Sequence, residues 1–263
     1  MSSLRDESMA IRQDERALLD SALMRARAAA YGAGEFLGQE SFMRAGEILS
    51  LASRAGIGPG TSVLDLCCGV AGPGRFITRE LGCEYLGVDR SSGAIGLARE
   101  RAGDLPCRFE VSRVPPVPPG PFDVVLLLET MLAFPDKTSL LRGVSSSLSS
   151  GGRLAFTFEE GQPLTRAERR RIPGADTVWL VPLPQMLACL AQAGLQVRWQ
   201  EECTRSHLAT VESLIAAYTA HESGIAELLG HEVLDELLLA HRLWRDWLRD
   251  GRARKFALLA ELL

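Results

Sequence analysis

The chain has 263 residues, of which 46% are hydrophobic and 24% charged, a composition typical of a globular protein with a full core. A formal net charge of −4 and a calculated pI of about 5.7 disfavour a nucleic-acid-binding protein and a basic membrane-surface patch. No apolar run reaches the length of a membrane-spanning helix, and the polar start MSSLRDESMAIRQDER does not resemble a secretion signal.

Helices are predicted at the N-terminal end of the chain. The segment 14–30 is rich in Ala, Leu and Arg and lacks Pro and Gly, which favours a helix. Three glycines in 31–39 end it. Apolar residues then recur at three- and four-residue spacing from Phe42 to Ala52, which indicates a second, amphipathic helix.

Apolar strands alternate with helices from residue 62 onward. The strands are continuous apolar runs, as expected for a parallel sheet covered on both faces. This rhythm predicts a Rossmann-like, doubly wound α/β fold. We expect strands at 62–68, 84–89, 107–112, 122–129 and 151–160, and helices at 72–81, 92–102 and 136–149.

The C-terminal third departs from this rhythm. A helix is expected at 183–195 and an alternating strand at 196–204. Two amphipathic helices should follow within 205–252, and the apolar run 254–262 is either a strand or a helix. We favour a strand, which completes a mostly parallel sheet of seven strands.

A single domain is therefore predicted over 1–263. Its parts would be an N-terminal helical cap at 1–55, a core at 56–204, a second helical cap at 205–252 and a closing strand at 253–263.

The stretch VLDLCCGVAGPG (63–74) reads as a buried strand that enters a glycine turn before a helix. Glycines there let a ligand approach the backbone and the free amides of the helix N-terminus. Asp89 ends the next strand, twenty residues after Gly69, where a carboxylate can accept hydrogen bonds from both hydroxyls of a ribose. The combination predicts a ligand that contains adenosine.

Two cofactor types suit this turn. A dinucleotide motif needs G-x-G-x-x-G, but Cys67 stands at the first glycine. Asp65, just before the turn, suits a ligand with positive charge such as S-adenosylmethionine, whereas a carboxylate there would repel a pyrophosphate. Arg90, which follows Asp89, is compatible with binding of the 2′-phosphate of NADP, so an NAD(P)-dependent oxidoreductase remains the alternative.

The motifs VLDLCCGVAGPG, YLGVDRS, FDVVLLLETMLAFPDK and LSSGGRLAFTF resemble the class I S-adenosylmethionine-dependent methyltransferases over roughly 60–160. Within this class the chain resembles the small-molecule branch that includes the sarcosine/dimethylglycine and ubiquinone-type enzymes. Two of the motif's glycines are replaced here, by Cys67 and Ala71.

The resemblance implies a role for each matching residue. Asp65 would lie under the methionine amino group, Gly69 and its neighbour Cys67 beside the methionine moiety, and Asp89 at the ribose. Other expected cofactor residues are Arg90 and Ser112 near the adenine, Glu129 and Thr130 between cofactor and substrate, and Gln39 near the sulfonium or carboxylate.

The expected activity is methyl transfer to a small-molecule acceptor (EC 2.1.1.-), which needs alignment and a nucleophile in the right protonation state. The catalytic candidates are Glu129, Glu159 and Tyr31, and His207 is either a base or a surface residue. Carboxylates near the expected mouth of the substrate pocket, which also include Glu160 and Asp176, favour an amine or another nitrogen nucleophile as the acceptor. Oxygen and carbon nucleophiles remain alternative acceptors. A non-catalytic S-adenosylmethionine-binding protein is a further alternative.

Partners and location follow from the same residues. The N/D-P-P-Y tetrad of enzymes that methylate adenine or glutamine is absent, since the sequence there is ETML, which argues against nucleic acid as substrate. Six cysteines without a C-x-x-C pair, and four histidines far downstream, predict thiols in a reducing cytoplasm and no metal site. We expect a monomer or homodimer without membrane contact.

Overall fold

The computed structural model describes residues 21–172 and 174–263. The first helix within this range is α2 (Ala22–Tyr31), and the first part of the helix expected over 14–30 lies outside the described residues. Ser21 caps α2, because its hydroxyl accepts a hydrogen bond from the amide of Met24. The second helix, α3 (Ala45–Arg54), begins three residues later than Phe42.

A seven-stranded sheet in the order β3-β2-β1-β4-β5-β7-β6 forms the centre of the molecule and confirms the predicted fold class. Neighbouring strands are parallel except at β7, which runs antiparallel to both β5 and β6. The strands are β1 (Ser62–Leu66), β2 (Glu84–Asp89), β3 (Cys107–Val111), β4 (Phe122–Leu127), β5 (Leu148–Gly161), β6 (Leu195–Glu202) and β7 (Ala253–Leu262). The closing segment is thus a strand, as favoured above.

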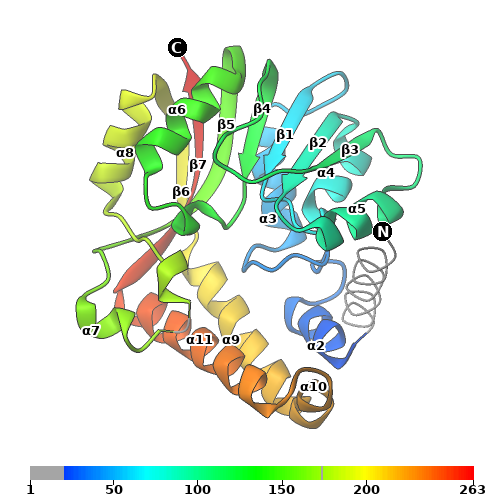
Figure 1. Cartoon of the computed structure of the whole chain (residues 1–263), viewed down its shortest axis with the longest axis vertical. Helices are drawn as coiled ribbons and strands as arrows, with labels where there is room; N and C mark the ends of the chain where they lie inside the picture. Colours follow the sequence, from blue (N-terminus) through cyan, green and yellow to red (C-terminus); the bar gives the residue numbers. More distant parts are fainter. Residues whose placement is uncertain (1–20, 173) are drawn as a thin grey trace, which may run out of the picture.

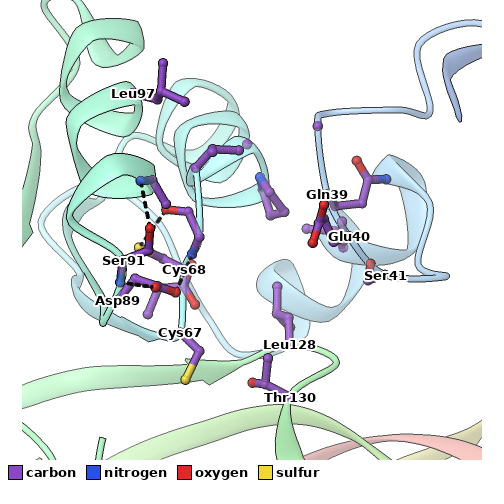
Figure 2. Close-up of a pocket in the computed structure, with 18 of the residues that line it drawn as sticks. Gln39, Glu40, Ser41, Cys67, Cys68, Asp89, Ser91, Leu97, Leu128 and Thr130 are labelled. Atoms are coloured by element: carbon purple, nitrogen blue, oxygen red, sulfur yellow. Dashed lines mark hydrogen bonds between the residues drawn. The ribbon is translucent and has the colours of Figure 1, made fainter. Parts of the chain in front are cut away.

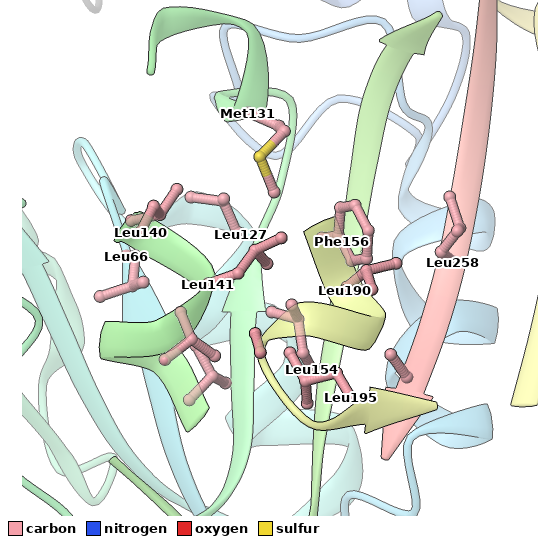
Figure 3. Close-up of a cluster of buried hydrophobic side chains, with 14 of the residues drawn as sticks. Leu66, Leu127, Met131, Leu140, Leu141, Leu154, Phe156, Leu190, Leu195 and Leu258 are labelled. Carbon is pink, nitrogen blue, oxygen red and sulfur yellow. The ribbon is translucent and has the colours of Figure 1, made fainter. Parts of the chain in front are cut away.

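Helices cover both faces of this sheet (Figure 1). One face packs against α3, α4 (Gly72–Leu81) and α5 (Ser92–Ala102), and the other against α6 (Lys137–Ser147) and α8 (Leu183–Gln192). Figure 3 shows the second of these layers, where Leu141 and Leu190 meet side chains of β4 and β5 such as Leu127 and Leu154. All four side chains are fully buried, which accounts for the continuous apolar runs in the sequence.

The caps gather at the end of the sheet where β1, β2, β4 and β5 terminate (Figure 1). The chain forms three helices here instead of the expected two: α9 (Thr204–Ala220), α10 (Glu222–Leu229) and α11 (His231–Asp250). Gly230, at a φ of 85°, separates the last two, and that backbone conformation suits glycine. Side chains of α2 join α9, α10 and α11 in one apolar cluster, so α2 and the C-terminal cap form a single layer.

Short helical turns complete the cap side: η1 (Met131–Ala133), α7 (Arg166–Arg169) and η2 (Ala175–Thr177). No helix in the described part of the chain is long and apolar enough to cross a bilayer.

Candidate active site

The glycine turn between β1 and α4 has an unusual backbone. Cys67, Gly69 and Ala71 have φ values of 62°, 55° and 53°, so two non-glycine residues occupy left-handed conformations that favour glycine. Such backbone strain is concentrated at functional sites. Gly72 faces the carbonyl of Leu37 so closely that a Cβ there would overlap it, and the turn therefore packs directly under the N-terminal cap.

A first cavity of about 550 Å³ opens over this turn. Figure 2 shows Cys67, Asp89 and Ser91 on one side and Gln39 on the other. It is lined by most of the residues predicted to bind a cofactor, namely Asp65, Cys67, Gly69, Asp89, Arg90, Thr130 and Gln39. Ser112 and Glu129 do not line this cavity, and their cofactor contacts stay predictions.

Asp89 fixes the shape of this cavity. Its Oδ2 accepts a hydrogen bond from the amide of Gly69 at 3.0 Å, and its Oδ1 accepts one from the amide of Ser91 at 2.8 Å. Two charge-assisted bonds from one carboxylate thus join the glycine turn to the start of α5. The residue expected to hold a ribose therefore also holds the loop.

Asp65 is buried beneath the turn, where Tyr85 donates a hydrogen bond from its hydroxyl to Oδ2 at 2.5 Å. Burial raises the pKa of Asp65 to about 7, although the bond from Tyr85 lowers it and Asp89 raises it further. The Tyr85 ring fills the space next to Gly74, where a Cβ would overlap it. A carboxyl that titrates near neutrality thus lies in the wall of the first cavity.

The segment between α2 and α3 forms the roof of the first cavity. Gln39 donates both amide hydrogens to backbone carbonyls, of Glu35 at 3.0 Å and of Met43 at 2.9 Å, and accepts a bond from Leu37. Its polar atoms therefore shape the segment, and the predicted contact with a cofactor stays a prediction. Tyr31 likewise donates its hydroxyl to the carbonyl of Ser41.

A second cavity of about 300 Å³ adjoins the first, and the two share Gln39, Glu40 and Ser41 as lining residues. All three predicted catalytic residues, Glu129, Glu159 and Tyr31, line this second cavity. Its other walls are largely aromatic or apolar: Phe42, Leu132, Leu214, Tyr218, Leu237, Ala240, His241 and Trp244.

A buried ion cluster contributes to the second cavity. Lys255 donates from Nζ to Glu129 Oε2 at 2.5 Å and to Glu159 Oε1 at 2.8 Å, and the side chains of all three are at most 5% exposed. Lys255 and Glu159 are direct partners in the β5–β7 register, so the antiparallel pairing brings them together. Glu129 reaches the same lysine from the end of β4.

Glu129 connects the core to the roof. It has a left-handed φ of 59°, and its amide donates to the hydroxyl of Thr157 at 2.7 Å. Its Oε2 also accepts a bond from the amide of Phe42 at 3.2 Å, while its Oε1 lies 3.8 Å from Nδ1 of His207, too far for a hydrogen bond. The strained backbone of Glu129 is consistent with a functional position.

The pKa values of the ionisable groups in this cluster are shifted in different directions. Burial raises the pKa of Glu129, but Lys255 and His207 outweigh this and lower it to about 2. Burial keeps the pKa of Glu159 above its usual range despite Lys255. Burial lowers the pKa of His207 to about 4, so its imidazole is neutral at pH 7.

Several other expectations are changed by the structure. Glu160, whose neighbour Glu159 lines the cavity, pairs instead with Arg254 at 3.0 Å. Asp176 lies in η2 and lines neither cavity. His207 is buried rather than on the surface, with 1% of its side chain exposed. Lys255 was not predicted as a site residue from the sequence, because it is a polar residue at the start of an otherwise mostly apolar closing strand.

Known proteins with sequence or structural similarity agree with this geometry. A family model described as a methyltransferase domain matches residues 63–152. Phosphoethanolamine N-methyltransferase 1 of Arabidopsis thaliana is 33% identical over 103 residues, which are 38% of this chain and 21% of that protein. The match thus spans about a fifth of the length of that relative.

Solved structures extend the likeness to nearly the whole fold. The cyclopropane synthase MmaA2 of Mycobacterium tuberculosis superimposes with a TM-score of 0.79 at 15% identity, covering 95% of this chain and 98% of that one. A putative sarcosine dimethylglycine methyltransferase of Galdieria sulphuraria gives 0.72 at 16% identity, with 82% and 84% covered. Residues 63–152 thus match the methyltransferase-domain family, and the whole chain shares its fold with these solved structures.

Proposed function

We propose that this protein transfers a methyl group from S-adenosylmethionine, bound in the first cavity, to a small molecule bound in the second. The observation that carries the proposal is the junction of the two cavities. Consecutive residues face opposite sides, since Thr130 lines the first cavity and Glu129 the second. Donor and acceptor would therefore lie side by side, as an in-line displacement requires.

The residues of the first cavity suit this cofactor. Space around Gly69 is open, so a ligand can approach the turn. The hydroxyl of Thr130 is buried beside the Cys67 thiol and has no nitrogen or oxygen partner in the described structure, so it has capacity to bind a ligand. Asp89 would hold the ribose and Asp65 the amino group, while the cofactor supplies an electrophilic methyl group on its sulfonium.

A nitrogen nucleophile is the favoured acceptor, because two carboxylates line the second cavity. Phosphoethanolamine and sterol methyltransferases among the relatives show that nitrogen and carbon acceptors both occur in similar proteins. The acidic net charge supports a small molecule over nucleic acid, and the six free cysteines support a cytoplasmic location.

The alternative is an NAD(P)-dependent oxidoreductase, and a ligand titration separates the two. Calorimetry with S-adenosylmethionine, S-adenosylhomocysteine and NADPH should show binding of the first two ligands alone. Asp89→Ala should abolish it, and circular dichroism checks that the variant is folded. Binding of NADPH alone would overturn the proposal, and a folded protein that binds the adenosyl ligands yet methylates no acceptor in a broad panel would indicate a non-catalytic binding protein.

A further inference from the structure

The ion cluster of the second cavity contains one cation for two carboxylates. Glu129 and Glu159 share Lys255. Arg27 also lines this cavity, but it donates to Tyr218 and to Glu40. When both carboxylates are ionised the cluster carries a net negative charge, and an uncompensated buried charge is costly.

Among the described lysines and arginines, Lys255 alone lies within ion-pair distance of these two carboxylates. Lys137 influences Glu159, but its Nζ donates to the backbone carbonyls of Met131 and Phe134. His207 is neutral at pH 7 for the reason given above. A cationic ligand would therefore balance the charge, whereas an anionic ligand would add to it.

Free hydrogen-bonding capacity exists at the same place. Glu159 Oε2 and Glu129 Oε1 are buried without a partner in the described structure. Buried polar atoms are nearly always hydrogen-bonded, so unpaired carboxylate oxygens indicate that a donor joins them in the working state. Glu129 Oε1 faces His207, and Glu159 Oε2 is therefore the freer acceptor for a ligand in the cavity.

The remaining walls suit an apolar body that carries a positive charge. Lys255 Nζ lies 4.9 Å from the ring centre of Phe42 and 6.0 Å from that of Trp244, so aromatic faces already surround a cation here. A volume of about 300 Å³ is at the lower end for small-molecule sites.

Resting on the proposed function, we infer that the acceptor is an unphosphorylated amine with an apolar body, that Glu159 takes its proton, and that Lys255 is the positioning residue that orients Glu159. The ammonium form would donate a hydrogen bond to Glu159 Oε2 and then transfer that proton to it, leaving a neutral amine and a carboxylic acid. The nitrogen lone pair forms the new C–N bond, while the electron pair of the broken S–C bond stays on sulfur. The methylated ammonium leaves, and the carboxylic acid returns its proton to water.

The test is calorimetry on the whole chain saturated with S-adenosylhomocysteine, which cannot react. Three matched probes are titrated at pH 7: phenethylamine, 2-phenylethanol and 2-phenylethyl phosphate. We expect the amine to bind at least about tenfold more tightly than either of the others, as a charge-assisted hydrogen bond implies. Equal affinities, tighter binding of the phosphate, or no binding of the amine would overturn the inference.

Two neighbouring residues provide a matched pair of variants. Glu159→Gln should remove the preference for the amine, whereas Glu160→Gln, which alters the pair with Arg254 outside the cavity, should keep it. Thermal melts check that both variants fold. Indistinguishable variants would refute the role of Glu159, and failure of S-adenosylhomocysteine to bind would instead refute the proposed function.

Lys255 is tested through proton release, which a merely structural role would not change. Burial holds the pKa of Glu159 above its usual range and Lys255 opposes this, so loss of the lysine should leave Glu159 more protonated. Phenethylamine binding to Lys255→Gln, measured in two buffers of different ionisation enthalpy, should then release more protons than binding to wild type. Lys255→Arg should restore the wild-type value, and equal proton release in all three proteins would refute the positioning role.

Discussion

Replacing Asp65 by Asn should remove a pH dependence of cofactor affinity that the buried carboxyl creates. In the free protein burial raises the pKa of Asp65 to about 7, so the carboxyl is mostly protonated below neutrality. A ligand whose ammonium interacts with Asp65 favours the ionised form. Affinity should therefore rise as the pH increases toward 7.

The magnitude follows from the ionised fraction of Asp65. This fraction is about 3% at pH 5.5 and about half at pH 7, so affinity should rise by about 15-fold between the two. The ligand's own amino group stays protonated over this window. Folding stability should change in the opposite direction: the folded pKa exceeds the unfolded value, and stability present below about pH 4 is lost by up to about 4 kcal/mol as the pH rises to 7.

Calorimetry with S-adenosylhomocysteine at pH 5.5 and 7, together with urea unfolding over pH 4–7, measures both effects. Asp65→Asn should bind with nearly the same affinity at both pH values and should lose the pH slope of stability that Asp65 contributes. A wild-type affinity that is flat or falls with pH would show that Asp65 does not contact the ligand's ammonium. Equal slopes in wild type and variant would show that another group titrates.

The other predictions concern packing and acid stability. Gly74→Ala should lower the free energy of unfolding by about 2–5 kcal/mol in urea melts, because its Cβ displaces the Tyr85 ring and its bond to Asp65. Gly46→Ala, where the Cβ meets only Glu35 at 3.7 Å, should cost nothing, and equal losses in the two variants would contradict this packing argument. Glu129→Gln should lower the free energy of unfolding by about 3 kcal/mol at pH 7. Because the folded pKa of Glu129 is lowered to about 2, the difference from wild type should vanish as the pH falls from about 4.5 to 2. A difference that persists at pH 2 would show that ionised Glu129 is not its source.

The fold could be predicted wherever local patterns determine it. The helices at 72–81 and 92–102 and the strand at 84–89 have the predicted bounds, because glycine turns or polar residues flank their apolar runs. Four strand ends were placed one or two residues too late, at β1, β3, β4 and β6. After β1 the chain leaves the ladder although Cys67 and Cys68 continue the apolar run. The C-terminal cap breaks at His221 and at Gly230, and of these two breaks the glycine was a signal present in the sequence.

Most residues of the cofactor cavity could be predicted from the sequence, because they are close together in the chain and belong to recognisable local motifs. The acceptor side was less so, because Lys255 lies 126 residues from Glu129 and 96 from Glu159. Only the antiparallel register of the closing strand shows that this lysine faces two carboxylates. Glu160 was equally plausible from sequence, and the alternation of side chains along β5 decides between it and Glu159.

Glu129 links the two halves of the proposed site. Its Oε2 accepts hydrogen bonds both from Nζ of Lys255 in β7 and from the amide of Phe42 in the roof segment. The roof segment beside Phe42 lines both cavities, and Gln39 ties it together through backbone bonds. A change in the charge of the ion cluster therefore acts on the roof of the cofactor cavity through the carboxylate of Glu129. We therefore expect occupancy of the acceptor cavity and retention of the cofactor to be coupled, because the bond from Phe42 joins Glu129 to the roof segment.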